Sequence, residues 1–230
     1  MIDAPTANPP SSGDPVDAEA EARSSTSPVA AAGAAGLLGG SVFFGCTGAL
    51  AAISVPTYVM HLRDTLGVSV TIGMTRMAER FIPATTMRTV AQRVITNDGE
   101  CDGRLWSPGE IASDVDAVVI LPASADFVAQ MANGFCPSIV AGVALHFEPP
   151  CLVVPSIPGT LEARSPYRRN LAQIEADGHV IPPTRPGPVL RLSDDSVTKQ
   201  ASILPPAGVT HHVRQLIIER RNRAVDDDHV

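Results

Sequence analysis

The sequence is poor in charged, lysine and aromatic side chains. Of its 230 residues, 18% are charged and 4% are aromatic, and Lys199 is the sole lysine among 17 basic side chains. The formal net charge is −7. Because binding to duplex nucleic acid requires clustered Lys and Arg to neutralise phosphates, this balance argues against nucleic acid as a main partner.

The cysteines lack the spacing of a metal or redox site. None of the four forms a CxxC or CxxxH pair, so the sequence predicts neither a zinc site nor a redox pair. We expect all four to be reduced and to pack as small buried hydrophobic side chains. They are Cys46, Cys101, Cys136 and Cys151.

A secretory signal and a convincing membrane span are also missing. Met1–Glu21 contains acids and prolines instead of a basic region followed by an apolar one. The charge-free stretch Val29–Met60 is long enough to cross a bilayer, but six glycines and Pro56 interrupt it. We therefore expect a cytoplasmic protein without a membrane span.

Composition divides the chain into three parts. Residues 1–40 are rich in Ala, Pro, Ser and Gly, cannot bury enough apolar surface to offset their ordering entropy, and are predicted to be disordered. Residues 41–225 form the predicted domain, and 226–230 form an acidic tail. Within the domain, 184–208 is read as a long loop punctuated by Pro and Gly, and loops of this length often act as lids.

Apolar strand-like segments alternate with helical segments along the domain, which is typical of an α/β fold. The predicted class is a Rossmann-like (flavodoxin-like) open parallel sheet with helices on both faces. The predicted strands cover 41–44, 68–74, 116–121, 150–155 and 179–182. The predicted helices run up to residue 66 and over 76–81, 84–90, 126–134, 139–146, 167–177 and 210–225.

Three loops follow predicted strands at the edge of the sheet where such folds bind ligands. They are Gly45–Ala49, Thr75–Arg76 and Pro122–Asp126. The first contains Gly45-Cys-Thr-Gly48, whose small residues let backbone N–H groups and a Thr hydroxyl approach a phosphate. It lacks the third glycine of a dinucleotide motif and the lysine of a P-loop. An ordinary tight turn explains this motif equally well.

Three segments together resemble the homo-oligomeric flavin-containing cysteine decarboxylases. They are Gly45-Cys-Thr-Gly-Ala-Leu-Ala-Ala52, Met74-Thr-Arg-Met-Ala-Glu-Arg-Phe-Ile82 and Pro122-Ala-Ser-Ala-Asp-Phe-Val-Ala-Gln-Met-Ala-Asn-Gly134. The resemblance implies bound FMN, with FAD less expected, and a homotrimer or dodecamer with the flavin near a subunit interface. By position it implies a set of flavin-binding residues: Gly45, Thr47, Gly48, Thr75, Phe81, Pro122, Ala123, Ser124, Asp126 and Ser156.

The chain departs from this family at two positions that carry chemistry. The resemblance places the family's catalytic His at Pro108 and its substrate-binding Asn at Pro158. Proline has no titratable side chain and no N–H group, so it serves neither role. The catalytic residue is therefore unassigned, with Glu110 and His146 as candidates. Two arginines after the altered motif are candidates for binding a substrate carboxylate, since guanidinium binds carboxylates in two-point fashion; they are Arg164 and Arg168.

The hypothesis that follows is a flavin-dependent oxidative decarboxylation. The substrate would be the C-terminal cysteine of a ribosomally made precursor peptide, and the product an aminoenethiol for an aminovinyl-cysteine ring, with loop 184–208 clamping the peptide. The alternatives are a flavin-binding partner or regulatory subunit without catalysis, a phosphopantothenoylcysteine decarboxylase, and a flavin prenyltransferase relative. No cysteine follows Cys151, which disfavours the coenzyme A route, because the resemblance implies a late cysteine for its reductive step.

Overall fold

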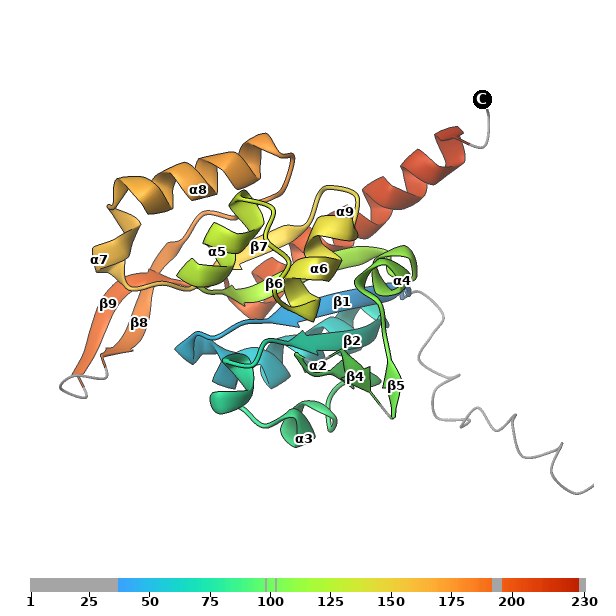
Figure 1. The fold of residues 1–230 in the computed structure, drawn as a ribbon, viewed down its shortest axis with the longest axis horizontal. Coiled ribbons are helices and arrows are strands. Elements are labelled where there is room, and N and C mark those ends of the chain that lie inside the picture. Colours follow the sequence, from blue (N-terminus) through green and yellow to red (C-terminus); the bar gives the residue numbers. More distant parts are fainter. Residues whose placement is uncertain (1–36, 98, 102, 192–195, 228–230) are drawn as a thin grey trace, which may run out of the picture. The chain divides into compact units, whose positions relative to one another are not determined.

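The computed structural model describes residues 37–97, 99–101, 103–191 and 196–227. Its centre is a five-stranded sheet in which all strands run parallel, in the order β3-β2-β1-β6-β7 (Figure 1). Counted among themselves, the strands follow the order 3-2-1-4-5 of a Rossmann sheet and not the order 2-1-3-4-5 of flavodoxin. The predicted Rossmann-like parallel sheet is confirmed. The strands are β1 (Ser41–Cys46), β2 (Ser69–Met74), β3 (Arg93–Ile95), β6 (Ala117–Ala123) and β7 (Leu152–Pro155).

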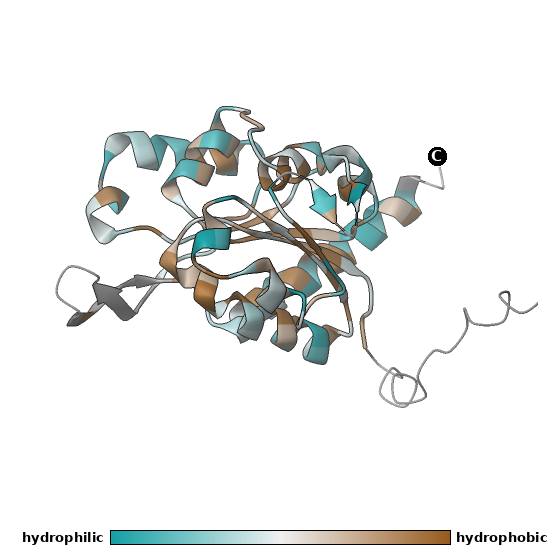
Figure 2. Cartoon of the chain, turned by 60° about the horizontal axis from the view of Figure 1, so that its bottom comes forward, coloured by the Kyte–Doolittle hydropathy of each residue, from teal (hydrophilic) through white to brown (hydrophobic). Residues whose placement is uncertain are grey.

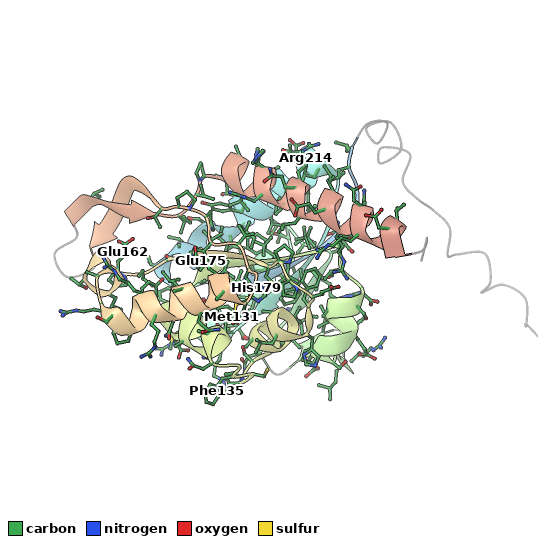
Figure 3. All side chains as sticks on the ribbon, turned by 90° about the horizontal axis from the view of Figure 1, so that it is seen from above. Met131, Phe135, Glu162, Glu175, His179 and Arg214 are labelled. Carbon is green, nitrogen blue, oxygen red and sulfur yellow. The ribbon has the colours of Figure 1, made fainter. Side chains whose placement is uncertain are left out.

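Helices cover both faces of the sheet. The face covered by α2 and α9 lies opposite the face covered by α5 and α6, and Figure 3 shows Arg214 of α9 and Phe135, which follows α5, on opposite sides of the sheet. The described helices are η1 (Leu50–Ser54), α2 (Val55–Leu66), η2 (Ala78–Arg80), α3 (Ala84–Met87), α4 (Pro108–Ser113), α5 (Ala125–Ala132), α6 (Ile139–His146), α7 (Gly159–Glu162), α8 (Ser165–Ala176) and α9 (Pro206–Asp227).

The strands are apolar on both faces because each face is covered by helices. In β1, Val42 and Phe44 belong to the core beneath α2 and α9, whereas Phe43 belongs to the core beneath α5 and α6. This alternation follows from the two-residue period of a strand. Figure 2 shows the hydrophobic colour concentrated along the sheet. Because helices bury the sheet on both faces, its strands contain few charged residues, which agrees with the low charge fraction of the sequence.

The domain begins four residues before the predicted boundary. Most of the segment predicted to be disordered, residues 1–36, lies outside the described residues. Leu37–Gly40, by contrast, belong to the fold, because the Gly39 N–H donates to the Leu66 carbonyl and the Gly40 carbonyl accepts from Ser69 N–H, both at 2.8 Å. At the other end, α9 continues to Asp227, so only 228–230 of the predicted acidic tail lie outside the described residues.

The prediction of an irregular loop over 184–208 is wrong. Two antiparallel strands, β8 (Arg185–Arg191) and β9 (Ser196–Ser202), pair from Arg185 with Ser202 to Arg191 with Ser196. Pro186 and Pro188 do not prevent this pairing, because prolines two residues apart share one edge of a strand, and an edge need not donate hydrogen bonds to a partner. The prolines in this segment therefore do not indicate a loop, because they lie within a paired strand.

Smaller differences have local causes. The predicted helix over 76–81 is the single turn η2, with Pro83 close behind it, and the predicted helix over 84–90 shortens to α3. The predicted strand over 179–182 makes one parallel bridge, Val180 to Leu152, before two prolines end its pairing. Between β3 and α4, the short strands β4 (Glu100–Cys101) and β5 (Arg104–Leu105) pair antiparallel.

Within the described part of the chain, no helix combines the length and apolar character needed to cross a membrane. The charge-free stretch before Arg63 instead becomes β1, the turn after it, η1 and most of α2. Pro56 lies in the first turn of α2, where a missing N–H costs nothing.

Helix α2 provides a test of the packing. Leu62 is fully buried between α2 and the sheet, whereas Met60 on the same helix is 59% exposed. We expect Leu62→Ala to lower the free energy of unfolding by about 2–5 kcal/mol and Met60→Ala to change it by less than about 0.5 kcal/mol. Urea denaturation followed by circular dichroism measures both. Equal effects of the two substitutions would contradict the assignment of the buried face.

Candidate active site

A large open cleft lies at the carboxyl ends of the sheet strands, with a volume of about 1590 Å³. Every strand of the sheet is followed, within two residues, by a polar side chain that lines this cleft. Parallel strands bring these side chains to one edge although they are far apart in the sequence. In chain order they are Thr47, Thr75, Asn97, Ser124 and Ser156.

Thr47 joins the two strands between which the chain reverses its direction of winding. Its side chain is 1% exposed. The hydroxyl donates to the Pro122 carbonyl at 2.6 Å and accepts from the Ser124 N–H at 2.8 Å. These bonds tie the end of β1 to the end of β6. The hydroxyl is thus engaged within the fold and holds the floor of the cleft, although the sequence placed it among the flavin-binding groups.

The two glycines of the first turn have different positions. Gly45 is buried in β1, where an added Cβ would lie 2.6 Å from side-chain atoms of both Ile120 and Val140, so this glycine lets α6 pack on the sheet. Gly48 lines the cleft, and an added Cβ would lie 2.2 Å from Met77 Cγ. The turn after β1 therefore touches the turn after β2, and glycine at position 48 permits this contact.

Two helices begin at the cleft. The Ser124 hydroxyl accepts from the Phe127 N–H and caps α5, and the Ser138 hydroxyl accepts from the Ala141 N–H and caps α6, each at 3.2 Å. The N-terminal end of a helix carries a partial positive charge that favours anions. Both serines line the cleft. The starts of both helices therefore direct partial positive charge towards the cleft, although Asp126 adds a formal negative charge in the first turn of α5.

Formal charge in the cleft comes from three side chains among the described lining residues. Arg76 and Arg80 stand on the side of β2, and Asp126 stands in the first turn of α5. The Asp126 carboxylate accepts a hydrogen bond from Gln130 Nε2 at 2.7 Å. Arg80 is exposed at the cleft and has no ion-pair partner among the residues described, so this side of the cleft offers a cationic group to an acidic ligand.

Most of the residues that the resemblance assigned to the flavin meet in this cleft. Those that line it are Thr47, Gly48, Thr75, Phe81, Ser124, Asp126 and Ser156. Three others, namely Gly45, Pro122 and Ala123, are buried in the strands directly beneath. Phe81 is 36% exposed and so presents its ring at the cleft surface.

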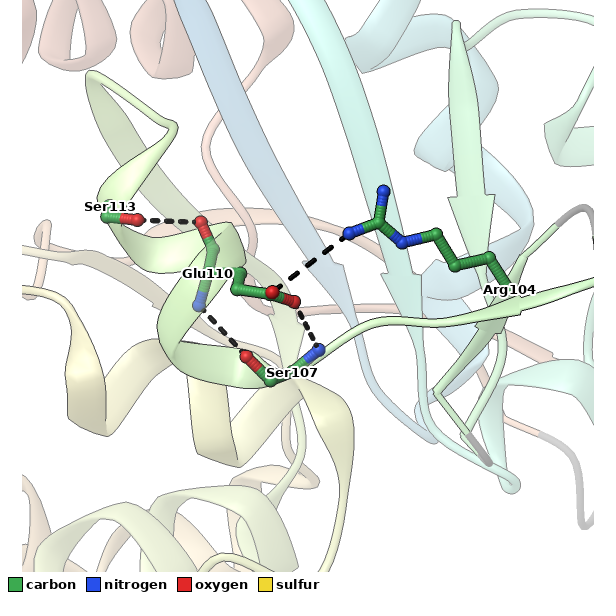
Figure 4. A network of polar contacts seen from close by, with 4 residues as sticks. All are labelled: Arg104, Ser107, Glu110 and Ser113. Atoms are coloured by element: carbon green, nitrogen blue, oxygen red, sulfur yellow. Dashed lines mark hydrogen bonds and ion pairs between the residues drawn. The ribbon is translucent and has the colours of Figure 1, made fainter.

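The two candidate bases lie elsewhere. Glu110 forms a capping box at the start of α4, where its carboxylate accepts from the Ser107 N–H and its own N–H donates to the Ser107 hydroxyl, each at 3.2 Å (Figure 4). Arg104 lies 4.0 Å from the same carboxylate. His146 ends α6, with Nδ1 2.9 Å from the Gly142 carbonyl oxygen. Neither residue lines the cleft, and no His or Cys is found among its described lining residues.

The two prolines at the positions of the family's catalytic His and substrate-binding Asn each lie at the start of a helix. Pro108 begins α4 and packs against Gly142 of α6, where an added Cβ would meet its ring at 2.7 Å. Pro158 precedes α7 and lines the cleft. The candidate carboxylate ligands, Arg164 and Arg168, are exposed outside the cleft, and Arg168 Nε donates to the Glu162 carbonyl at 3.4 Å.

Three of the four thiols are buried, as expected, but Cys136 is exposed between α5 and α6. Burial raises the pKa of Cys46 and of Cys151 to about 12, so both stay protonated and unreactive. His179 does not line the cleft; its Nδ1 accepts from the Cys151 N–H at 3.1 Å, and burial lowers its pKa.

Several residues that line the cleft were not predicted from the sequence. Asn97 follows β3, a three-residue strand without an apolar pattern of its own. Ser138 precedes an apolar helix, which is an N-cap signal that could have been used. Met77 and Arg80 lie inside a motif that was recognised, but nothing in its spacing shows that they face the ligand.

Sequence comparison finds relatives with named activities. Mersacidin decarboxylase from Bacillus sp. (strain HIL-Y85/54728) is 26% identical over 140 residues, which cover 61% of this chain and 71% of that protein. The coenzyme A biosynthesis bifunctional protein CoaBC of Escherichia coli (strain K12) is 26% identical over 148 residues, but the match covers 36% of its length. The chain thus spans about a third of the bifunctional protein.

Comparison with solved structures finds the same fold. A His-to-Asn variant of EpiD in complex with the substrate peptide DSYTC superposes with a TM-score of 0.70 at 16% identity, over 77% of this chain and 99% of that chain. SpaF, described as an FMN-dependent cysteine decarboxylase, superposes with a TM-score of 0.64 at 22% identity, over 79% and 97%. The family model described as Flavoprotein matches residues 37–215, and the chain therefore belongs to the Flavoprotein family.

Proposed function

We propose that this chain binds FMN in the cleft and catalyses the oxidative decarboxylation of the C-terminal cysteine of a ribosomally made peptide. The observation that carries the proposal is the polar cleft at the switch point of a Flavoprotein-family sheet, in a chain with sequence similarity to mersacidin decarboxylase. The product would be a peptide aminoenethiol, which can enter an aminovinyl-cysteine ring.

The cleft suits a flavin mononucleotide. Hydroxyl groups after β2 and β7, the starts of α5 and α6, and two arginines offer donors to a ribityl chain and a phosphate. Phe81 offers an apolar surface to the ring. Small-molecule sites typically measure roughly 300–1,000 Å³, so about 1590 Å³ leaves room for the end of a peptide beside the cofactor.

The division of labour follows from the residues present. Bound flavin supplies the capacity to accept two electrons from the cysteine, which loses CO₂ and two hydrogen atoms. The chain binds and orients both molecules: Thr47 fixes the floor of the cleft, and Ser124 and Ser138 hold two helix N-termini towards it. Holding the flavin and the peptide in a fixed orientation would raise the reaction rate, because the entropy cost of bringing the two molecules together is paid on binding.

A second candidate is a flavin-binding partner subunit without catalysis. The observation that favours it is the absence of an imidazole among the described lining residues, with Pro108 and Pro158 at the positions of the family's His and Asn. This candidate predicts the same cofactor and a peptide that stays unmodified. Both candidates would therefore bind flavin and be yellow, and only conversion of the peptide distinguishes them.

We further propose a homo-oligomer, a trimer or a dodecamer, that acts in the cytoplasm. The large opening of the cleft and the exposed Phe135 after α5 support a subunit contact at this edge. Four free cysteines are consistent with a reducing compartment. Light scattering of the purified protein gives the mass of the assembly, and a monomer would contradict the proposal.

The function is tested by incubating the FMN-loaded protein with a Cys-terminated peptide. We expect a mass loss of about 46 Da, the sum of CO₂ and two hydrogen atoms, by mass spectrometry. The same peptide ending in Ser is the control and should stay unchanged, because it lacks the thiol that is oxidised. A yellow protein that leaves every Cys-terminated peptide intact would favour the inactive partner instead.

Gly48 tests the contact between the turns that follow β1 and β2. In Gly48→Ala the new methyl group would lie 2.2 Å from Met77 Cγ and 2.4 Å from its Cβ, so this corner of the cleft must shift. We expect FMN affinity to fall by about tenfold, measured by quenching of flavin fluorescence. Adding Met77→Gly removes both clashing atoms and should restore most of the affinity. Wild-type affinity in Gly48→Ala alone would show that the corner does not contact the cofactor.

Thr47 tests the link between β1 and β6. Thr47→Val keeps the shape but leaves the Ser124 N–H without its acceptor, so we expect a loss of about 1–3 kcal/mol in the free energy of unfolding. FMN binding should weaken with it. Thr47→Ser keeps the hydroxyl and should remain close to wild type in both urea denaturation and FMN titration. Identical behaviour of the Val and Ser variants would rule out a role for the hydroxyl.

A further inference from the structure

The cleft differs in charge from one end to the other. Its two arginines, Arg76 and Arg80, follow β2, whereas residues 156–160 follow β7 and line the opposite end. Strands β2 and β7 are three strand spacings apart in the sheet, which corresponds to about 14 Å. Residues 156–160 contain no charged side chain. The segment that lines the β7 end therefore brings none of the cationic groups of the β2 end.

The main chain of this segment is anchored at both of its ends. The Ser156 N–H donates to the Ala123 carbonyl at 2.9 Å, which continues the pairing of β7 with β6. Two residues further on, the Pro158 carbonyl accepts from the Leu161 N–H at 2.9 Å as α7 begins. The side chains between these two anchors are therefore presented to the cleft by a fixed backbone.

Three apolar side chains at this end of the cleft form what we call the apolar wall, namely Phe127, Ile157 and Pro158. Ile157 is half-buried and packs against the core cluster that contains Phe127. Pro158 is exposed at the cleft surface. Because position 158 is a proline, the wall has neither the amide side chain that the resemblance implies there nor an N–H group at that position. A concave apolar surface of this kind is stabilised when an apolar group covers it.

In the proposed function, the flavin and the peptide share the cleft. The two arginines and Phe81, which offer their groups to the flavin, all stand on the β2 side. The end of the peptide is then left with the β7 side. Asp126, the lining residue directly before Phe127, accepts a hydrogen bond from Gln130 and keeps a negative charge near the wall. This charge disfavours an acidic side chain of the peptide.

We propose that the apolar wall is a specificity subsite that binds a large apolar side chain directly before the C-terminal cysteine of the peptide, an inference that rests on the proposed function. A Leu side chain there would bury apolar surface against Phe127, Ile157 and Pro158. An Asp side chain would lose its water without gaining a hydrogen bond from the wall. The substrate class is thus narrowed to peptides that end in a large apolar residue followed by cysteine.

Binding of unreactive peptides tests the subsite without turnover. Short peptides that end in Xaa-Ser, and so lack the thiol, are titrated into the FMN-loaded protein by isothermal titration calorimetry, with Leu, Ala, Asp or Lys at Xaa. We expect the Kd for Leu to be about tenfold or more below that for Ala, and the Kd for Asp to be the highest. Equal Kd values for Leu, Ala and Asp, no binding of any peptide, or Lys bound as tightly as Leu would overturn the proposal.

Two substitutions assign the preference to the wall. Pro158→Asn places an amide on its exposed part, and Ile157→Ala removes apolar surface, so we expect each to reduce the ratio of the Ala and Leu Kd values to below about threefold. Leu105→Asn, at an exposed position on β5 outside the cleft, is the matched control and should keep the wild-type ratio. Thermal melting followed by circular dichroism shows which variants fold. A wild-type ratio in every wall variant that folds would overturn the proposal.

The same peptides ending in Cys separate this proposal from the proposed function. We expect kcat/KM for decarboxylation to follow the order of the Kd values, because the wall contacts the peptide both before and during the reaction. If the Xaa-Ser peptides show the preference but every Cys-terminated peptide stays intact, the subsite stands and the proposed catalysis is wrong. Equal turnover of the Leu, Ala and Asp peptides would leave the catalysis in place and overturn the subsite.

Discussion

The site depends on one buried hydroxyl group at the centre of the sheet. Thr47 donates to the Pro122 carbonyl and accepts from the Ser124 N–H, and thereby joins the ends of β1 and β6 where the winding reverses. Because both partners are backbone groups, the link fixes the main chain and not merely a side chain. The cap of α5 by Ser124, and thus the direction of that helix towards the cleft, follows from this one contact.

The arrangement places binding groups on rigid elements and leaves the chemistry to the cofactor. Polar side chains stand one or two residues beyond the strands, and the sheet beneath them is buried on both faces. Cys46 ends β1 beside the cleft, whereas Cys151 precedes β7 at the opposite edge of the sheet; burial raises the pKa of both thiols to about 12 and keeps them protonated.

The fold was predictable where a local pattern was strong. The apolar run 116–121 predicted β6 to within two residues, and the predicted helix end at residue 66 is the observed end of α2. β3 and the β8–β9 pair were missed, because pairing with a neighbouring strand, and not local composition, stabilises Arg93–Ile95, Arg185–Arg191 and Ser196–Ser202. In the site, the loops that carry Thr47, Thr75 and Ser124 were found from their place in the alternation, Ser156 was assigned from the resemblance, and Asn97 after β3 was missed. Arg80 was missed, because the position of its turn depends on hydrogen bonds that Thr75 accepts from the Ala78 and Glu79 N–H groups, which no spacing reveals.

The central claim is that loss of CO₂ from the peptide is coupled to a two-electron transfer to the flavin. Anaerobic mixing of the FMN-loaded protein with one equivalent of Cys-terminated peptide tests it directly, with flavin absorbance at about 450 nm and released CO₂ followed together. The account predicts that the absorbance is bleached with a yield of one CO₂ per flavin. Release of CO₂ without bleaching, or a spectrum that stays unchanged with the peptide intact, would contradict it.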